Sequence, residues 1–232
     1  MLDWLSPEAA TALMLSLRVS LVATLASLPV GVLVAYALAR GRFVGHGLLN
    51  GLVHLPLILP PVVTGYLLLL TFGRQGWIGA SLWDWFGFTF AFRWTGAALA
   101  AAVMAFPLLV RAIRLAIEAV DPKLEEAAST LGASRLVVFG TVTLPLILPG
   151  IIAGAVLAFA KAMGEFGATI TFVANIPGET QTLPTAIYAF LQVPGGDGAA
   201  LRLVAVSVAV AMAALALSEW LARRVARRIA GR

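Results

Sequence analysis

The chain has 232 residues, of which 61% are hydrophobic and 12% are charged, about half the charged share of a soluble domain. These proportions exclude a soluble globular protein, and the absence of cysteine excludes disulfides, thiolate metal sites and cysteine nucleophiles. The formal net charge of +5 could suit nucleic acid, but Lys and Arg gather at the ends of apolar segments, where they orient a membrane protein instead. We therefore expect lipid rather than nucleic acid as the surrounding partner.

Five apolar segments predict an all-α integral membrane protein, because each comes near the ~20 residues that a spanning helix needs. We place the spans at residues 12–39, 47–72, 92–117, 144–173 and 201–222, in a single transmembrane domain over residues 1–232. The link over residues 71–93 is rich in Trp and Phe, which is typical of an interfacial aromatic belt rather than of a sixth span.

The distribution of Lys and Arg predicts the orientation, because positive residues are enriched on the cytoplasmic side. One side receives Arg40, Arg42, Arg111, Arg114, Lys123, Arg135, Arg223, Arg224, Arg227, Arg228 and Arg232. The other receives Arg18, Arg74, Arg93 and Arg202, together with several acidic residues. We expect the N-terminus outside and the C-terminus, with a basic tail that anchors on anionic lipid, in the cytoplasm.

The second predicted span is interrupted in its middle by Pro56, Pro60 and Pro61. Proline removes a backbone donor, so it is tolerated in a span where neighbouring groups or a cavity satisfy the freed carbonyls. The break is either a static kink that aids packing or a flexing helix that lines a pathway. Asn50 and His54, one turn apart on this helix, are expected to make interhelical hydrogen bonds rather than to bind a ligand, and two His without Cys make a metal site improbable.

Residues 121–143 form a polar island between the third and fourth spans. Asp121-Pro122 is a helix start, and Gly132 is a candidate left-handed cap at the end of that helix. Ser134 can begin a second short helix that runs through residue 139. One apolar face is expected on the first helix, from Leu124, Ala127, Ala128 and Leu131 at i, i+3, i+4 and i+7. The island is either a binding surface for a cytoplasmic partner or a simple turn that connects two spans.

The fourth predicted span contains Lys161 and Glu165, which are four residues apart and can therefore pair on one helix face. Gly164 and Gly167 flank Glu165 and allow a kink or a close approach. A charge inside a span is costly and marks either an interior pair or a pathway. In one interpretation the two residues neutralise each other. In the other, Lys161 helps an oxyanion past the cavity and Glu165 helps to form a gate, without being a direct ligand.

Several motifs carry a resemblance to a known family. The spacing of Glu126-Ala127-Ala128, Gly132 and Leu144-Pro145 resembles the EAA loop of binding-protein-dependent ABC importer permeases. The segments 54–63, 164–170 and 175–180 resemble the molybdate-transporting members of that family (ModB type). The resemblance covers nearly the whole chain and implies the type I ABC importer permease fold, with a cytoplasmic coupling helix between spans three and four.

The resemblance also implies roles and partners. Coupling to the ATPase would fall to Leu124, Glu125, Glu126, Ala127, Ala128, Leu131, Gly132, Ala133, Leu144 and Pro145, and the translocation path or gate to Pro60, Pro61, Lys161, Gly164, Glu165 and Gly167. The expected partners are a second copy of the chain, two cytoplasmic ATPase subunits (ModC type) and an external molybdate-binding protein (ModA type). Neither Lys of the chain follows Gly as in a P-loop, so ATP and Mg are expected on the partner ATPase, and no cofactor, metal or catalytic residue on this chain.

The sequence therefore predicts a non-enzymatic permease subunit of an ATP-driven importer in the inner membrane, which moves molybdate by alternating access. Sulfate, thiosulfate and tungstate are the alternative substrates within the class. A self-sufficient ion-coupled carrier or channel is the alternative from another class, and it would leave the polar island without a purpose. Residues 71–93 and 175–197 are the candidate docking surfaces for the external binding protein.

Overall fold

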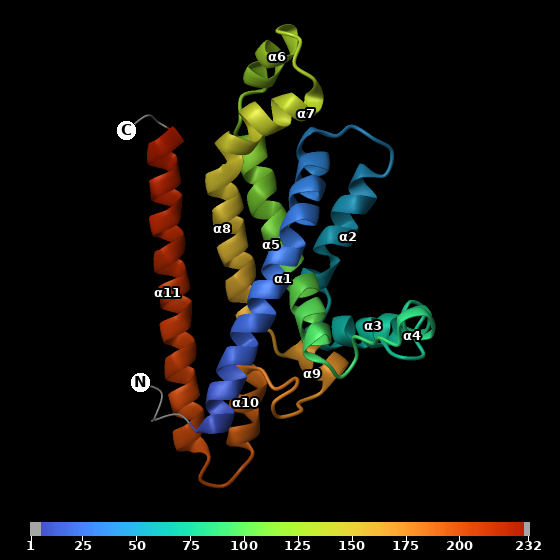
Figure 1. Cartoon of the computed structure of the whole chain (residues 1–232), viewed down its shortest axis with the longest axis vertical. Coiled ribbons are helices and arrows are strands. Elements are labelled where there is room, and N and C mark those ends of the chain that lie inside the picture. The colour runs from blue at the N-terminus through green and yellow to red at the C-terminus, as the bar shows by residue number, and fades with distance from the viewer. Residues whose placement is uncertain (1–5, 230–232) are drawn as a thin grey trace.

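The computed structural model describes residues 6–229, and within the last helix the side chains up to residue 217 and those of residues 219–221 and 224. All regular elements in this range are helical: α1 Pro7–Arg40, α2 His46–Ile58, α3 Pro61–Phe72, α4 Gly79–Phe86, α5 Trp94–Glu118, α6 Pro122–Thr130, α7 Arg135–Val138, the π-helix η1 Phe139–Thr143, α8 Leu144–Met163, α9 Gly167–Val173, α10 Leu183–Leu191 and α11 Asp197–Ile229 (Figure 1). The basic tail contributes Arg224, whereas the Arg223, Arg227 and Arg228 side chains and Arg232 lie outside the described residues.

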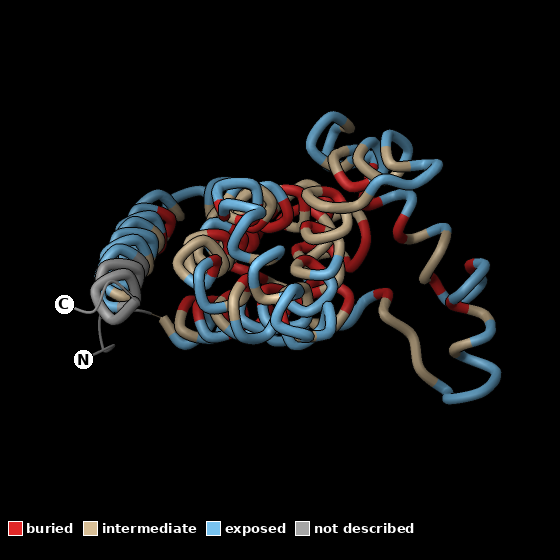
Figure 2. Tube along the Cα trace, turned by 90° about the horizontal axis from the view of Figure 1, so that it is seen from above, coloured by how far each residue is buried: buried red, intermediate tan, exposed pale blue. Residues whose placement is uncertain are grey.

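Helices α1, α5 and α8 form the centre of the molecule (Figure 1). They approach closely because small residues line the contacts, as is typical of helices packed in a membrane. Many alanines of α5 are buried, and a Cβ on Gly31 of α1 would lie 2.9 Å from the Leu109 side chain of α5. Seen along the bundle, the buried residues gather in the middle, whereas α11 at the edge is exposed along most of its length (Figure 2).

Four helices are long and apolar enough to cross a membrane, and five segments qualify if the bent α2–α3 pair counts as one. The four are Pro7–Arg40, Trp94–Glu118, the composite helix Arg135–Met163 and Asp197–Leu221. The all-helical membrane fold expected from the sequence is therefore confirmed, although two of the expected spans differ in form.

The segment expected to span at 47–72 is broken into two helices, and the chain bends by 116° between them. The break follows from the prolines: Leu59 and Pro60 are extended, and Pro61 begins α3. With 13 residues, α2 reaches only about 20 Å. The interruption expected at the prolines is therefore present as a sharp bend, after which α3 turns aside and packs against α9.

The segment expected to span at 144–173 also ends early. Helix α8 stops at Met163, and the chain turns through residues 164–166 before α9 begins at Gly167. We call residues 161–168 the elbow. A further short helix, α10, lies in the link between α9 and α11. Helices α6 and α7 lie at one end of the bundle, and α3, α4, α9 and α10 lie toward the other (Figure 1).

Candidate functional site

The first helix of the polar island begins and ends as its sequence predicts. The Asp121 side chain accepts a hydrogen bond of 3.0 Å from the Lys123 amide, and Pro122 occupies the first turn. Gly132 has φ of +87°, and the amides of Gly132 and Ala133 return to the carbonyls of Ser129 and Ala128. This pair of bonds is a Schellman motif, which only a residue tolerant of the left-handed region completes at low cost. Ser134, by contrast, starts α7 without a side-chain cap bond.

The apolar face of α6 has no cover among the described residues. No residue of α6 is buried, and Leu124 and Leu131 are 50% and 89% exposed. Ala127 and Glu126 are exposed as well, whereas Ala128 is half-buried. We call residues 121–145, which are the polar island and the first two residues of α8, the coupling segment, after the role that the resemblance implies. Helix α6 lies at the tip of the molecule, beyond the bundle of spanning helices (Figure 1).

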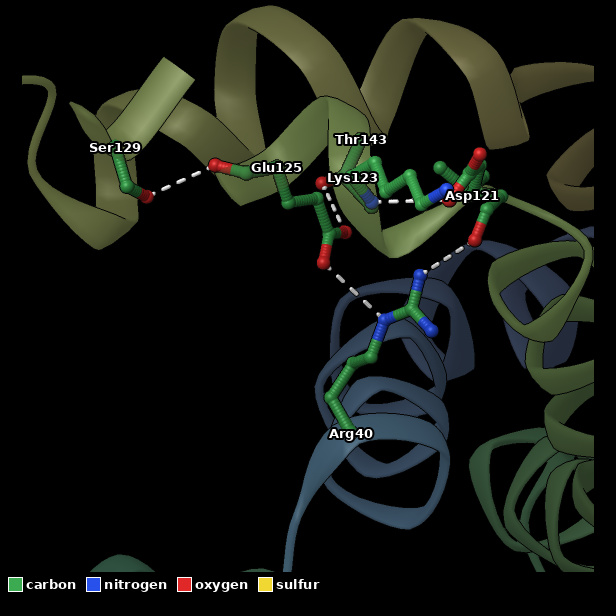
Figure 3. A network of polar contacts seen from close by, with 7 residues as sticks. Arg40, Asp121, Lys123, Glu125, Ser129 and Thr143 are labelled. Carbon is green, nitrogen blue, oxygen red and sulfur yellow. Dashed lines mark hydrogen bonds and ion pairs between the residues drawn. The ribbon is translucent and has the colours of Figure 1, made fainter. Parts of the chain in front are cut away.

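Glu125 lies on the other side of α6 and connects the coupling segment to the bundle (Figure 3). Its carboxylate pairs with Nε of Arg40 at 3.3 Å and accepts a 2.7 Å hydrogen bond from the Thr143 hydroxyl. Arg40 also donates from Nη2 to the carbonyl of Val120 at 2.9 Å. The network joins the end of α1, the approach to α6 and the π-helix before α8.

Arg40 and Thr143 are site residues that the sequence analysis missed. The sequence indicates only an orientation marker at Arg40, and Thr143 enters it only as the last residue of the polar island. A basic residue at the end of a span carries no sign of the carboxylate that it meets, because their contact depends on how α1 packs beside α5. Thr143 is fully buried, and the neighbouring Phe139 ring packs edge-on against Tyr36 of α1 at 5.2 Å.

Of the remaining predicted coupling residues, Ala133 lies in the link between α6 and α7, and Leu144 and Pro145 begin α8. Ala133 and Leu144 are half-buried, and Pro145 is exposed in the first turn of α8. The turn directly before Leu144 is a π-helix, an element that recurs at functional sites of helical proteins. The predicted coupling residues thus include exposed residues on α6 and residues at the start of α8, where the segment joins the bundle.

The elbow contains the predicted ion pair. Lys161 Nζ lies 2.6 Å from Glu165 Oε2, and the Ala168 amide donates to Glu165 Oε1 at 3.1 Å. The Glu165 side chain is 2% exposed and that of Lys161 is 30% exposed. The carboxylate is therefore fully engaged, since it neutralises the lysine and satisfies an amide at the start of α9.

Only some of the remaining candidate gate residues lie at the elbow's contact with α3. A Cβ on Gly167 would lie 2.7 Å from the Pro61 ring, so this glycine permits the close contact between α9 and α3. Pro60 is exposed at the bend. Gly164 instead borders an apolar cavity of about 340 Å³ between α8, α10 and α11. The structure joins Lys161, Glu165, Gly167 and Pro61 into one junction and leaves Pro60 and Gly164 at its edge.

His54 makes its hydrogen bond within its own helix, whereas the Asn50 side chain makes one to another helix. His54 Nδ1 lies 2.8 Å from the carbonyl of Asn50, which is a bond within α2 and not between helices. The Asn50 side chain does reach another helix, since its Oδ1 accepts from Arg114 Nη1 of α5 at 3.1 Å. The expectation of interhelical hydrogen bonds is confirmed for Asn50 and wrong for His54.

Comparison with known proteins places this arrangement among transporters. Residues 27–229 match the family described as the binding-protein-dependent transport system inner membrane component. The chain is 63% identical over 221 residues to the molybdenum transport system permease protein ModB of Escherichia coli (strain K12), covering 95% of this chain and 96% of that protein. It is 35% identical to the sulfate transport system permease protein CysT of Salmonella typhimurium, over 95% of this chain and 80% of the relative.

The fold also matches a solved structure. A bacterial ABC transporter for the acidic polysaccharide alginate superposes with a TM-score of 0.73 at 20% identity, covering 95% of this chain and 81% of that one. At that identity the likeness concerns the fold alone. The permease fold of type I ABC importers, which the EAA-like loop implied, is thereby confirmed.

Proposed function

Because the chain belongs to the family of inner-membrane components of binding-protein-dependent transport systems, we propose that it is the permease subunit of an ATP-driven molybdate importer. The observation that carries the mechanism is the coupling segment, which presents exposed leucines outward and is attached to two long helices by Glu125. The substrate is supported by 63% identity to a molybdenum permease over nearly the whole chain.

In this proposal two copies of the chain form the path, and each α6 docks on one of two cytoplasmic ATPase subunits of the ModC type. ATP and Mg bind to those subunits. Closure of the ATPases moves α6, and the contacts of Glu125 with Arg40 and Thr143 pass the movement to α1 and α8. The spans then open outward and receive molybdate from an external binding protein of the ModA type.

The orientation follows from the same assignment. The α6 end is cytoplasmic, which also places the C-terminal end of α11 in the cytoplasm and the N-terminus outside. The elbow, which contains Lys161, Gly164, Glu165 and Gly167, then lies in the outer half of the protein and forms the candidate gate together with Pro60 and Pro61. The ion pair favours a structural role for Lys161, because its ammonium is engaged by Glu165.

Sulfate is the second candidate substrate, and the observation in its favour is the 35% identity to a sulfate permease over 95% of this chain. Molybdate and sulfate are both tetrahedral dianions, as are tungstate and thiosulfate. A self-sufficient carrier or channel is the weaker proposal, because it gives the exposed face of α6 no partner.

The test is uptake of radiolabelled molybdate into liposomes that contain this chain with its ATPase and the external binding protein. We expect uptake that requires ATP and the binding protein and that survives a hundredfold excess of sulfate. Uptake abolished by sulfate would overturn molybdate as the preferred substrate. Uptake without ATP or without the binding protein would overturn the importer assignment.

A further inference from the structure

A second polar site lies apart from both the coupling segment and the elbow. It is a cavity of about 260 Å³ between α2 and α5, toward the α6 end of both helices, lined by Asn50, His54, Arg111, Arg114, Leu115 and Glu118. The volume exceeds that of several water molecules at about 30 Å³ each, so a small hydrated ion fits. Two arginines and a histidine on two apolar helices are unusual enough to require an explanation.

Arg111 is the central feature of this cavity. Among the described residues it makes no hydrogen bond, ion pair or aromatic contact, although it lies about 10 Å inside the end of α5. Arg111 is exposed on a helix that is long and apolar enough to cross a membrane, and Leu115, which lines the same cavity, is 58% exposed. A guanidinium in such surroundings is costly without an anion, and Arg is suited to bind a tetrahedral oxyanion through paired N–H donors.

The other polar groups of the cavity are arranged to support an anion. Arg114 pairs with Glu118 at 2.7 Å and holds Oδ1 of Asn50, so the amide nitrogen of Asn50 keeps its two donors. His54 Nδ1 must donate to the Asn50 carbonyl, since a carbonyl only accepts, and its protonated form would add a donor at Nε2. Two guanidiniums and one carboxylate leave one net positive charge with His54 neutral.

We propose that this cavity binds a tetrahedral oxyanion on the α6 side of the membrane. Two sources have that chemistry. One is the transported dianion on its way to release, which rests on the proposed function. The other is the phosphate of an anionic lipid headgroup, which does not. In either case Arg111 supplies the free charge, Asn50 the amide donors, and the pair of Arg114 with Glu118 fixes Asn50 in place.

The experiment uses the full transporter with its ATPase subunits, nucleotide-free, in nanodiscs of phosphatidylcholine. Binding of radiolabelled molybdate is measured without the external binding protein. Arg111→Gln should weaken binding about tenfold or more, because it removes charged hydrogen bonds. Asn50→Asp, which keeps the shape and adds a negative charge, should weaken it as well. Arg42→Gln, an exposed arginine outside the cavity, is the matched control and should bind like the wild type.

The second arm measures retained phosphatidylglycerol by native mass spectrometry for the same four proteins. Loss of molybdate binding in Arg111→Gln and Asn50→Asp but not in Arg42→Gln identifies the transported dianion as the ligand. Loss of retained phosphatidylglycerol in the same pattern identifies the headgroup. If neither ligand distinguishes the two cavity variants from Arg42→Gln, the proposal is wrong. Uptake by the wild type is measured in parallel, so that failure of the substrate assignment is seen separately.

Discussion

Glu125 and Glu165 are both held by a cation, yet they organise the chain in opposite ways. Glu125 joins three elements through Arg40 and Thr143, and its side chain is 17% exposed. Glu165 is 2% exposed and bonds only within its own neighbourhood, to Lys161 and to the Ala168 amide. The first arrangement can change partners without unfolding a helix, whereas the second cannot lose a partner without stranding a buried charge. This contrast suits a moving connection at one end and a fixed junction at the other.

The largest expected effect is at the elbow. Lys161→Met leaves the Glu165 carboxylate buried without its cation, which costs about 3–5 kcal/mol. Glu165→Gln should cost less, since Lys161 is 30% exposed and the amide oxygen of Gln can still accept from Ala168. We would measure the melting temperature of the detergent-purified permease and its co-purification with the ATPase.

Combining the two changes tests whether they act on one interaction. The double variant Lys161→Met with Glu165→Gln should regain part of the assembly that Lys161→Met loses. Independent, additive losses would show that the pair is not an energetic unit. If assembly returns while uptake stays low, Lys161 also serves the oxyanion path, and if uptake returns as well its role is structural.

The next effect concerns the end of α6. Gly132→Val places a β-branched residue at φ of +87°, which costs about 1–2 kcal/mol and redirects α7. We expect reduced co-purification with the ATPase and reduced ATP-dependent uptake. Gly198→Val is the matched control, because that helical glycine has open space around it and no positive φ. Normal binding and uptake by Gly132→Val would contradict the assignment of α6 as the coupling helix.

A smaller effect on stability, but a clear one on transport, is expected from the Glu125 network. Arg40→Gln and Glu125→Gln should each cost about 1 kcal/mol or less, since the pair is partly exposed. Uptake should fall more than assembly does, because the link from α6 to α1 is weakened. The double variant should be no worse than either single one, and Arg42→Gln should behave like the wild type. Additive losses of uptake would mean that Arg40 and Glu125 act separately.

The same contrast explains what sequence can predict. The Asp121 cap, the left-handed Gly132 and the Lys161–Glu165 pair depend on neighbours within five residues, so spacing alone identifies them. The apolar segments likewise predict the all-helical membrane fold, and the residue spacing identifies the EAA-like loop. The assignment of α6 as the surface that meets the ATPase stays a prediction.

What could not be predicted depends on packing between distant segments. Arg40 meets the Val120 carbonyl across 80 positions, and that contact exists only because α1 packs against α5. The prolines predicted a break in the second span, but the 116° bend also requires α9 as a partner for α3, through Gly65 and Gly167. The cavity around Arg111 likewise forms between α2 and α5 and has no local motif.

The smallest perturbation tests the placement of the two networks on opposite sides of the membrane. Ser134 beside α7 and Ser81 on α4 are both exposed, and the chain has no native cysteine, so each can be replaced singly by Cys. Such surface changes should alter stability by less than about 0.5 kcal/mol. An impermeant thiol reagent added to intact cells should label Ser81→Cys and spare Ser134→Cys until the membrane is opened. The reverse pattern would place the Glu125 network outside, where no ATP-driven partner could reach α6, and labelling of both would show that the bend of α3 leaves α4 on the same side as α6.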